Sequence, residues 1–438
     1  MTTAYGMIGT GDFPSGHVPQ SYREGLIGWD YKGMAPFTAI TGKIETKPIN
    51  SDKHTWFVQA PPERAGTVTG VYNDPALTSA YVANAGVAGT IVYVKMAAAL
   101  AGEFLASHTV ELGVATFPMY LIHGKVIAHP YVDGANSFVT VRLKESDVTV
   151  QAKTLANCNK VTIIGSAFAH GEVAPRSVVY YPEDLYNRTQ IWRNALNLTN
   201  NALQEKTRYG TPEYKRVKGQ VLQMHTLDRE WSCIRGQRWE GIGANGQPEY
   251  HTMGMVDYIR RSITAGMIPS THIADFRVDH AGKTWIEKGS AWLNTKMELL
   301  YRKGTNGERL SFCGSGVRQG INDIAMTYGT IDLTPESHVW GLDIDAWKHG
   351  FGKAGLITHP LFNKDDDWRN AWLFFNLRNI KWCPFGNMDL HFRKAPPKEN
   401  EEQVAGEDGI LEEFYTQGCY EWGAAVDYLL LFGVGKDG

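Results

Sequence analysis

Short apolar runs separated by Gly, Asn and Asp fill residues 70–170. The runs GTIVYVKM, FPMYLIHGKVIA and SFVTVRL are rich in β-branched and aromatic residues, which is typical of strands. Residues 97–101 are mostly alanine and predict one short helical turn among these strands. We therefore expect a small β-rich subdomain in this part of the chain.

A long helix is predicted at residues 211–239. Thr211 has the character of an N-cap, and Pro212 suits the first helical position. Such a helix would be about 43 Å long. Apolar side chains recur at spacings of three and four and predict one apolar stripe, made of Val217, Val221, Met224, Leu227, Trp231 and Ile234.

The segments on either side of this helix have other patterns. Residues 1–35 are rich in Gly and Tyr and predict an extended arm that lies on another surface. A short apolar piece at Phe37 and Ile40 then leads to a strand-like run, 53–59, which ends at Pro61 and Pro62. Residues 176–200 alternate polar and apolar positions, which favours an exposed, extended hairpin arm.

Residues 250–395 predict a compact α/β unit. Helical periods occur in MGMVDYIRRSI and at 289–303 and 317–326, whereas GLITHPLF and AWLFFNLRNIKWC are strand-like. Residues 395–409 have almost no apolar side chain and predict an exposed loop. The last two apolar runs, ILEEFYTQGCYEWG and AAVDYLLLFGV, predict a terminal β-hairpin.

Composition narrows the class of protein. The chain has 438 residues, 43% hydrophobic and 20% charged, so we expect an ordinary folded protein with two to four structural units. The net charge of −3 argues against a dedicated nucleic-acid binder, which usually has a basic surface. Residues 1–16 lack the pattern of a signal peptide, and no apolar stretch has the ~20 residues of a membrane helix. We therefore expect a cytosolic chain without a membrane partner.

Cysteine usage predicts neither a zinc framework nor a disulfide scaffold. The five cysteines are widely spaced and contain no CxxC pair, and they are Cys158, Cys233, Cys313, Cys383 and Cys419. Free thiols in a reducing cytosol are the simplest interpretation.

The remaining chemical motifs lack the context that each needs. A literal GxGxxG occurs at 241–246, but a dinucleotide site needs a strand before it and a helix after it, and here a predicted helix precedes it and Pro248 follows. The acidic run 365–367 predicts a solvated loop tip, because it lacks the alternation of a calcium loop. The histidines show no metal-ligand spacing. We therefore expect no catalytic residue, no metal and no cofactor.

Several motifs follow one another in a recognisable order. MAPFTAI is followed by His54-x-Trp56, and VTIIGSAFAHGEVAP is followed by YNRTQIWRNALNLTN. The long helix comes next, with Arg229 and Glu230 in its second half. The turn HTMGM follows, and Glu407-Asp408-Gly409 introduces the last strands. In this order the motifs resemble the major capsid proteins of tailed bacteriophages with the Hong Kong 97-type fold. Met255 departs from that pattern, since relatives usually have a second glycine there.

The resemblance implies an α+β chain of the Hong Kong 97-type phage capsid fold with an inserted β-rich subdomain. It implies five parts, which are an N-terminal arm (1–50), extended-loop strands (51–69 and 171–205), the insertion (70–170), a peripheral domain with the spine helix (206–254 and 396–438) and an axial domain (255–395).

The same resemblance implies a role in building a shell. Copies of the chain would form pentamers and hexamers of an icosahedral head enclosing the genome, in a virion assembled in the bacterial cytoplasm. Implied partners are other copies, the portal, scaffold or decoration proteins, and packaged double-stranded DNA bound without sequence specificity. The motifs also suggest assembly residues, namely Trp56, Asn187, Gln190, Trp192, Arg193, Arg229 and Glu230.

Two other functions stay open from the sequence. An encapsulin-like nanocompartment shares the implied fold and would hold an enzyme cargo instead of a genome. A cytosolic hydrolase with a β-rich accessory domain would need a pocket of clustered titratable residues, and no motif indicates one.

Overall fold

The computed structural model describes residues 34–42, 44–59, 64–171, 179–205, 212–302, 308–328, 333–339, 342–394 and 409–438. It mixes helices and strands, as the α+β prediction requires, and the chain forms two compact units, Phe57–Glu183 and the remainder. Most of the predicted N-terminal arm and of the predicted loop at 395–409 lies outside the described residues. None of the described helices is both long and apolar enough to cross a membrane.

The smaller unit is a closed barrel of strands. The barrel order is β3-β4-β7-β6-β5-β8. Its strands are β3 (Ala65–Tyr72), β4 (Ile91–Met96), β5 (His108–Val114), β6 (Phe117–Val126), β7 (Phe138–Leu143) and β8 (Lys160–Ser166), and a short helix α2 spans Ala98–Ala101. The expected strands and helical turn are therefore present, and the first barrel strand begins five residues before the predicted start of the insertion.

Alternation of side chains fills the barrel. Along β4 the burial alternates, and Val92, Val94 and Met96 are buried with branched residues from the other barrel strands. The chain enters on β3 and leaves on β8, and these strands are paired, with Ala65 opposite Thr162. The two ends of the barrel segment therefore lie side by side, so the segment can be inserted at one point of another domain.

One buried carboxylate binds hydroxyl and backbone N–H groups from several parts of the barrel. Asp147 is 5% exposed and accepts hydrogen bonds from the hydroxyls of Tyr81 and Tyr120 and from the backbone N–H groups of Asn84 and Leu155. Burial and the bond to Asp147 raise the pKa of Tyr81 to about 12, so this hydroxyl stays a donor at neutral pH.

The larger unit contains a five-stranded sheet built around one long strand. β21 (Gly409–Trp422) pairs with β10 (Gln190–Thr199), β19 (Ile380–Pro384) and β20 (His391–Lys394), and β1 (Glu45–Thr46) joins parallel to β19. β2 (Lys53–Val58) pairs only with β9 (Glu183–Arg188) among the described strands. The predicted hairpin at 176–200 is therefore wrong, since β9 and β10 pair with different, distant strands.

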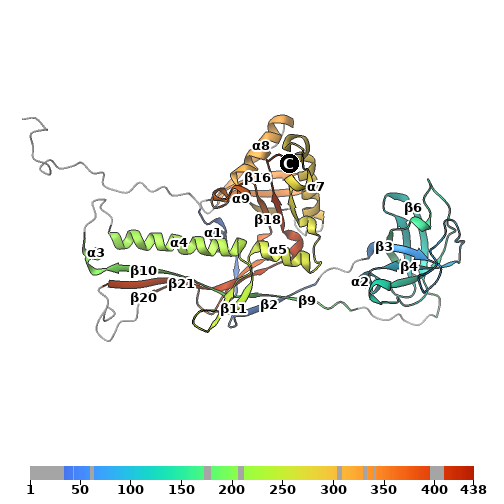
Figure 1. Ribbon diagram of the computed structural model, residues 1–438, viewed down its shortest axis with the longest axis horizontal. Coiled ribbons are helices and arrows are strands. Elements are labelled where there is room, and N and C mark those ends of the chain that lie inside the picture. Colours follow the sequence, from blue (N-terminus) through green and yellow to red (C-terminus); the bar gives the residue numbers. More distant parts are fainter. Residues whose placement is uncertain are drawn as a thin grey trace, which may run out of the picture. The chain divides into compact units, whose positions relative to one another are not determined.

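The spine helix α4 (Glu213–Arg235) lies along β10 and β21 (Figure 1). A short helix α3 (Asn200–Gln204) precedes it and α1 (Pro36–Thr41) packs against it. The predicted apolar stripe is partly wrong, because Met224 is 57% exposed. The buried positions follow another line along the helix, made of Val221, His225, Arg229, Glu230, Cys233 and Ile234.

A second, seven-stranded sheet forms the other part of this unit, with order β13-β22-β18-β14-β17-β16-β15. Its strands are β13 (Ile273–Asp275), β14 (Glu308–Cys313), β15 (Leu333–Val339), β16 (Leu342–His349), β17 (Gly352–Thr358), β18 (Trp372–Phe375) and β22 (Leu429–Phe432). Its helices are α5 (Met255–Thr264), α6 (Phe276–Asp279), α7 (Trp285–Arg302), α8 (Ser315–Tyr328) and α9 (Asp366–Arg369). Helices α7 and α8 share one apolar core with the sheet (Figure 1).

Three local predictions are corrected here. The last two strands, β21 and β22, belong to different sheets, so the terminal hairpin is wrong. The predicted helix does not lead into the GxGxxG segment, because α4 ends at Arg235 and β11 (Trp239–Ile242) follows. Residues 243–246 lie in the turn between β11 and β12 (Pro248–His251), with Gly246 at φ +74°. Asp365 is not at a free loop tip, because its carboxylate accepts the backbone N–H of Asp367 at the start of α9 and pairs with Arg235.

Removing the barrel carboxylate should loosen the barrel. We expect Asp147→Ala to destabilise it by about 2 kcal/mol, because buried hydroxyl and N–H donors lose their acceptor. Amide hydrogen exchange in β5, β6 and β8 should then be roughly 30-fold faster. Asp133→Ala, at an exposed carboxylate of the same unit, is the control and should leave the exchange unchanged. Equal exchange in both variants would contradict this account of Asp147.

Candidate functional site

Glu230 holds the first described helix against the spine helix. Its side chain is 0% exposed, and its oxygens accept the backbone N–H of Phe37 at 2.8 Å and of Thr38 at 2.7 Å. The Thr38 hydroxyl donates a third bond at 2.7 Å. The carboxylate thus satisfies the unpaired N–H groups at the start of α1.

The same carboxylate reaches the seven-stranded sheet through His359. The His359 Nε2 lies 2.8 Å from Glu230 Oε1, and both side chains are fully buried. The His359 ring stacks on Phe362 and contacts the edge of Phe312. Glu230 therefore joins three segments that are far apart in the sequence.

Arg229 faces the five-stranded sheet. Its guanidinium lies 4.3 Å from the centre of the Trp382 ring and donates to the Tyr420 hydroxyl at 3.3 Å. Asp389 pairs with it at 3.7 Å. The side chain is 8% exposed, so this cation is held by aromatic and anionic groups within the chain.

His225 completes the buried polar face of α4. Its ring nitrogens lie 2.8 Å from the Asn194 side-chain oxygen and 2.8 Å from the Thr416 hydroxyl. Burial lowers the pKa of His225 below its usual value, which favours the neutral imidazole. The helix is thus fixed to both β10 and β21 by hydrogen bonds.

Asn187 binds the turn before α5 to β21. Its Nδ2 donates to the Tyr420 carbonyl at 2.8 Å and to the Thr252 hydroxyl at 3.1 Å, and its Oδ1 accepts the N–H of Met253 at 2.7 Å. This environment accounts for the departure at Met255. The close approach falls on Gly254, where a Cβ would lie 2.7 Å from the Gly236 nitrogen, while Met255 fills the core.

Gln190 and Trp192 continue the same contact along β10. The Gln190 side-chain oxygen accepts the N–H of Thr252 at 3.1 Å, and Trp192 donates to the Ser232 hydroxyl of α4 at 3.0 Å. Trp192 is 4% exposed. Both residues therefore connect elements within one chain.

Trp56 and Arg193 have opposite environments. Trp56 on β2 is 8% exposed and stacks on His54. The Arg193 side chain on β10 is 61% exposed and forms an ion pair with Glu413 of β21. Among the seven suggested assembly residues, Arg193 alone has an exposed side chain, and a role of the seven in assembly stays a prediction.

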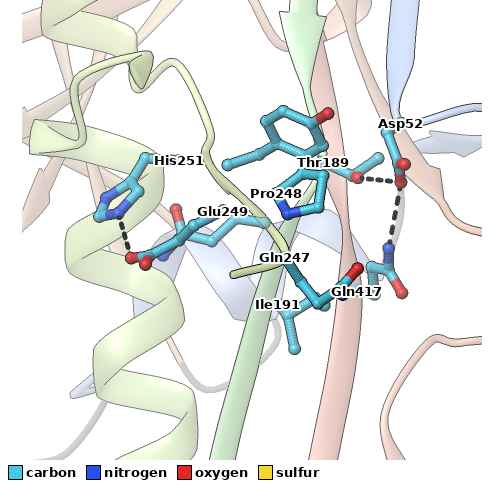
Figure 2. Close-up of a pocket in the computed structure, with 10 residues that line it drawn as sticks. Asp52, Thr189, Ile191, Gln247, Pro248, Glu249, His251 and Gln417 are labelled. Carbon is cyan, nitrogen blue, oxygen red and sulfur yellow. Dashed lines mark hydrogen bonds and ion pairs between the residues drawn. The ribbon is translucent and has the colours of Figure 1, made fainter. Parts of the chain in front are cut away.

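A cavity of about 460 Å³ with polar and apolar lining residues lies between β10 and the β11–β12 hairpin (Figure 2). On one side the Asp52 carboxylate accepts hydrogen bonds from Thr189 and Gln417, and on the other His251 binds Glu249 at 3.1 Å (Figure 2). The lining residues contribute no nucleophile paired with a base, so this cavity has no recognisable catalytic arrangement.

One cluster of polar side chains was not predicted from the spacing of residues in the sequence. His54 of β2, Cys383 of β19 and Glu421 of β21 each place a potential ligand atom within 4.8 Å of the others. His54 lies more than 300 residues before Cys383 and Glu421, and the three residues occur in no spaced motif. Only the pairing of β19 with β21 and the position of β2 could therefore reveal the cluster.

These elements define a class of protein. The chain has a spine helix on an extended sheet, a second sheet with flanking helices, and a strand pair leading to an inserted barrel. These elements agree with the Hong Kong 97-type architecture of phage capsid subunits that the sequence motifs imply. The chain belongs to the SU10 major capsid protein family, whose family model matches residues 10–424.

Individual relatives are more distant. The chain is 25% identical over 232 residues to a major capsid protein of Pseudomonas phage PaMx41, a match covering 53% of this chain. The chain therefore spans about half of that relative's length, 52%.

Solved structures with low sequence identity were also found. Chains from Mycobacterium phage Bobi (8% identity, TM-score 0.43, covering 95% of this chain and 96% of that chain) and Microbacterium phage Oxtober96 (10%, TM-score 0.42, 95% of each) are similar over nearly their full length. The SrpI encapsulin of Synechococcus elongatus PCC 7942 is similar over 58% of this chain and 77% of that chain (8%, TM-score 0.39).

Loss of the Glu230 carboxylate should destabilise the larger unit. We expect Glu230→Ala to lower the free energy of unfolding by about 3–5 kcal/mol, since His359 and the start of α1 lose their buried partner. Denaturant unfolding of the unassembled chain measures this. Glu249→Ala, at an exposed glutamate, is the control and should change the value by less than about 0.5 kcal/mol. A similar effect of both substitutions would count against the assigned role.

The neutral state of His225 should make stability depend on pH. Its folded pKa lies below the usual 6.5, so the unfolded chain takes up a proton first as pH falls. The stabilisation is present above about pH 6.5 and is lost below it. His225→Gln should therefore show a weaker loss of unfolding free energy between about pH 7 and 5 than the parent chain. Identical slopes in the two titrations would refute this assignment.

Proposed function

We propose that this chain is the major capsid protein of a tailed phage and that its copies self-assemble into pentamers and hexamers of an icosahedral head. The family match over residues 10–424 carries the proposal. The head would enclose the phage genome, and the protein would reside in the virion after assembly in the host cytoplasm. The chain would act as a structural protein without catalytic activity.

The β2–β9 ribbon supports assembly by overlapping subunits. Among the described strands, β2 and β9 pair only with each other, so each has one edge without a strand partner. Such edges and the side chains beside them are suited to contacts with a neighbouring copy. Contacts that are individually weak become strong when many are formed around a closed shell.

The near-neutral charge fits a container for DNA. With a net charge of −3, the chain has no excess of cations for tight binding of phosphates. We therefore propose that packaged double-stranded DNA is contained without sequence-specific contacts. The portal and any scaffold or decoration protein would be further partners of the assembled shell.

Electron microscopy of the expressed full-length chain tests this function. We expect closed shells or rings with five-fold and six-fold symmetry, because a heterologous ring closes by rotation. A monodisperse monomer under all assembly conditions would overturn the proposal. Native particles without a tail or genome, but with an enzyme cargo, would show a nanocompartment instead.

A charge reversal on β10 tests the expected assembly face. Arg193→Glu should lower the yield of shells at least ~10-fold, because a like charge at an interface costs several kcal/mol. Arg302→Glu is a matched control, since the Arg193 and Arg302 side chains are 61% and 60% exposed and each pairs with one glutamate. Both variants should unfold within about 1 kcal/mol of the parent chain, as expected for exposed ion pairs. Equal shell yields for the two variants would exclude Arg193 from assembly.

A further inference from the structure

One face of the five-stranded sheet carries side chains with sulfur, nitrogen and oxygen donor atoms, and His54 of β2 lies beside them. Cys383 on β19 lies directly opposite Cys419 on β21, and Lys381 lies directly opposite Glu421. Because side chains alternate along a strand, these four residues project from one face. The opposite face carries Trp382, Tyr420 and Trp422, which are fully buried in the aromatic core.

His54 lies against this donor face from β2. Its Nε2 is 2.9 Å from Glu421 Oε2, and the donor atoms of His54, Cys383 and Glu421 all lie within 4.8 Å of one another. Donor atoms around a tetrahedral zinc ion are about 3.5 Å apart, given bond lengths of about 2.0–2.3 Å. Small rotations of three side chains would therefore bring the donors to binding distance.

The donor set selects a particular class of metal. A thiolate, an imidazole and a single carboxylate suit Zn²⁺, whereas Ca²⁺ and Mg²⁺ prefer an all-oxygen environment. A divalent ion held by one thiolate, one carboxylate and a neutral imidazole forms a site with no net charge.

We propose that His54, Cys383 and Glu421 bind one Zn²⁺ ion that ties β2 to β19 and β21. The three ligands belong to the larger unit, and the site is independent of whether shells form. It differs from the expectation, based on cysteine spacing, that the chain binds no metal.

Two polar neighbours surround the Cys383 sulfur. Cys419 lies directly opposite Cys383 on β21, and His54 lies near it from β2. A sulfur ligand beside a second thiol has a neighbour that can donate a hydrogen bond to it. Glu421 also interacts electrostatically with Lys47 and Lys381. Lys381 in addition forms an ion pair with Glu45 at 3.2 Å.

A metal ion fits this cluster better than a substrate does. Cys383 is 0% exposed, and the side chains of His54 and Glu421 are 11% and 18% exposed. A thiolate beside an imidazole and a carboxylate also resembles a nucleophile with its base, but a peptide or ester carbonyl would have to reach the buried sulfur. A metal ion is much smaller than such a substrate, and the partly exposed His54 and Glu421 side chains offer it a route to the sulfur.

Metal analysis of the reduced, tag-free, full-length chain tests the site. After incubation with zinc chloride and gel filtration, we expect about one zinc ion per chain by atomic emission. With cobalt chloride we expect a thiolate-to-metal charge-transfer band in the near ultraviolet and visible bands of tetrahedral intensity. These spectra need no substitution, so they stay informative if a variant does not fold.

Matched substitutions locate the ion. Cys383→Ala and His54→Ala should each weaken zinc binding at least ~10-fold and remove or shift the cobalt bands. Cys158→Ala and Cys313→Ala alter buried thiols elsewhere and should bind as the parent chain does. Less than about 0.1 zinc per chain with no charge-transfer band in the parent would overturn the proposal. So would equal losses in all four variants.

Discussion

The larger unit depends on the buried carboxylate of Glu230. A carboxylate out of contact with water is costly unless donors surround it, and here the donors come from α1 and from His359, which follows β17. The interaction therefore constrains folding of the larger unit, because α1, α4 and the segment that follows β17 must all be in place before the charge is compensated.

β21 extends this constraint through the five-stranded sheet. Its Thr416 binds His225, its Tyr420 binds both Arg229 and Asn187, and its edge partners are β10, β19 and β20. A one-residue slip of β21 would turn each of these groups to the other face. The polar groups of the helix therefore specify the strand register more strictly than an apolar contact would.

How much could be predicted from the sequence differs between elements. The barrel strands and the presence of the spine helix follow from local periodicity, and the ordered motifs indicated the family. The buried line on α4 did not follow, because His225, Arg229 and Glu230 are polar and become core residues only through partners far away in the chain. The separation of β21 from β22 and the cluster at His54 likewise depend on strand pairing between distant segments. No local pattern encodes such pairings.

The closed barrel has a consequence for a crowded shell. Every barrel strand has a neighbouring strand on both sides, so none of the barrel strands presents a whole open edge to another copy. In the proposed shell, barrels of neighbouring copies would therefore touch without joining into continuous sheets. Whatever meets this unit encounters side chains and loops, and so its surface can change in sequence while the strands beneath remain inert toward one another.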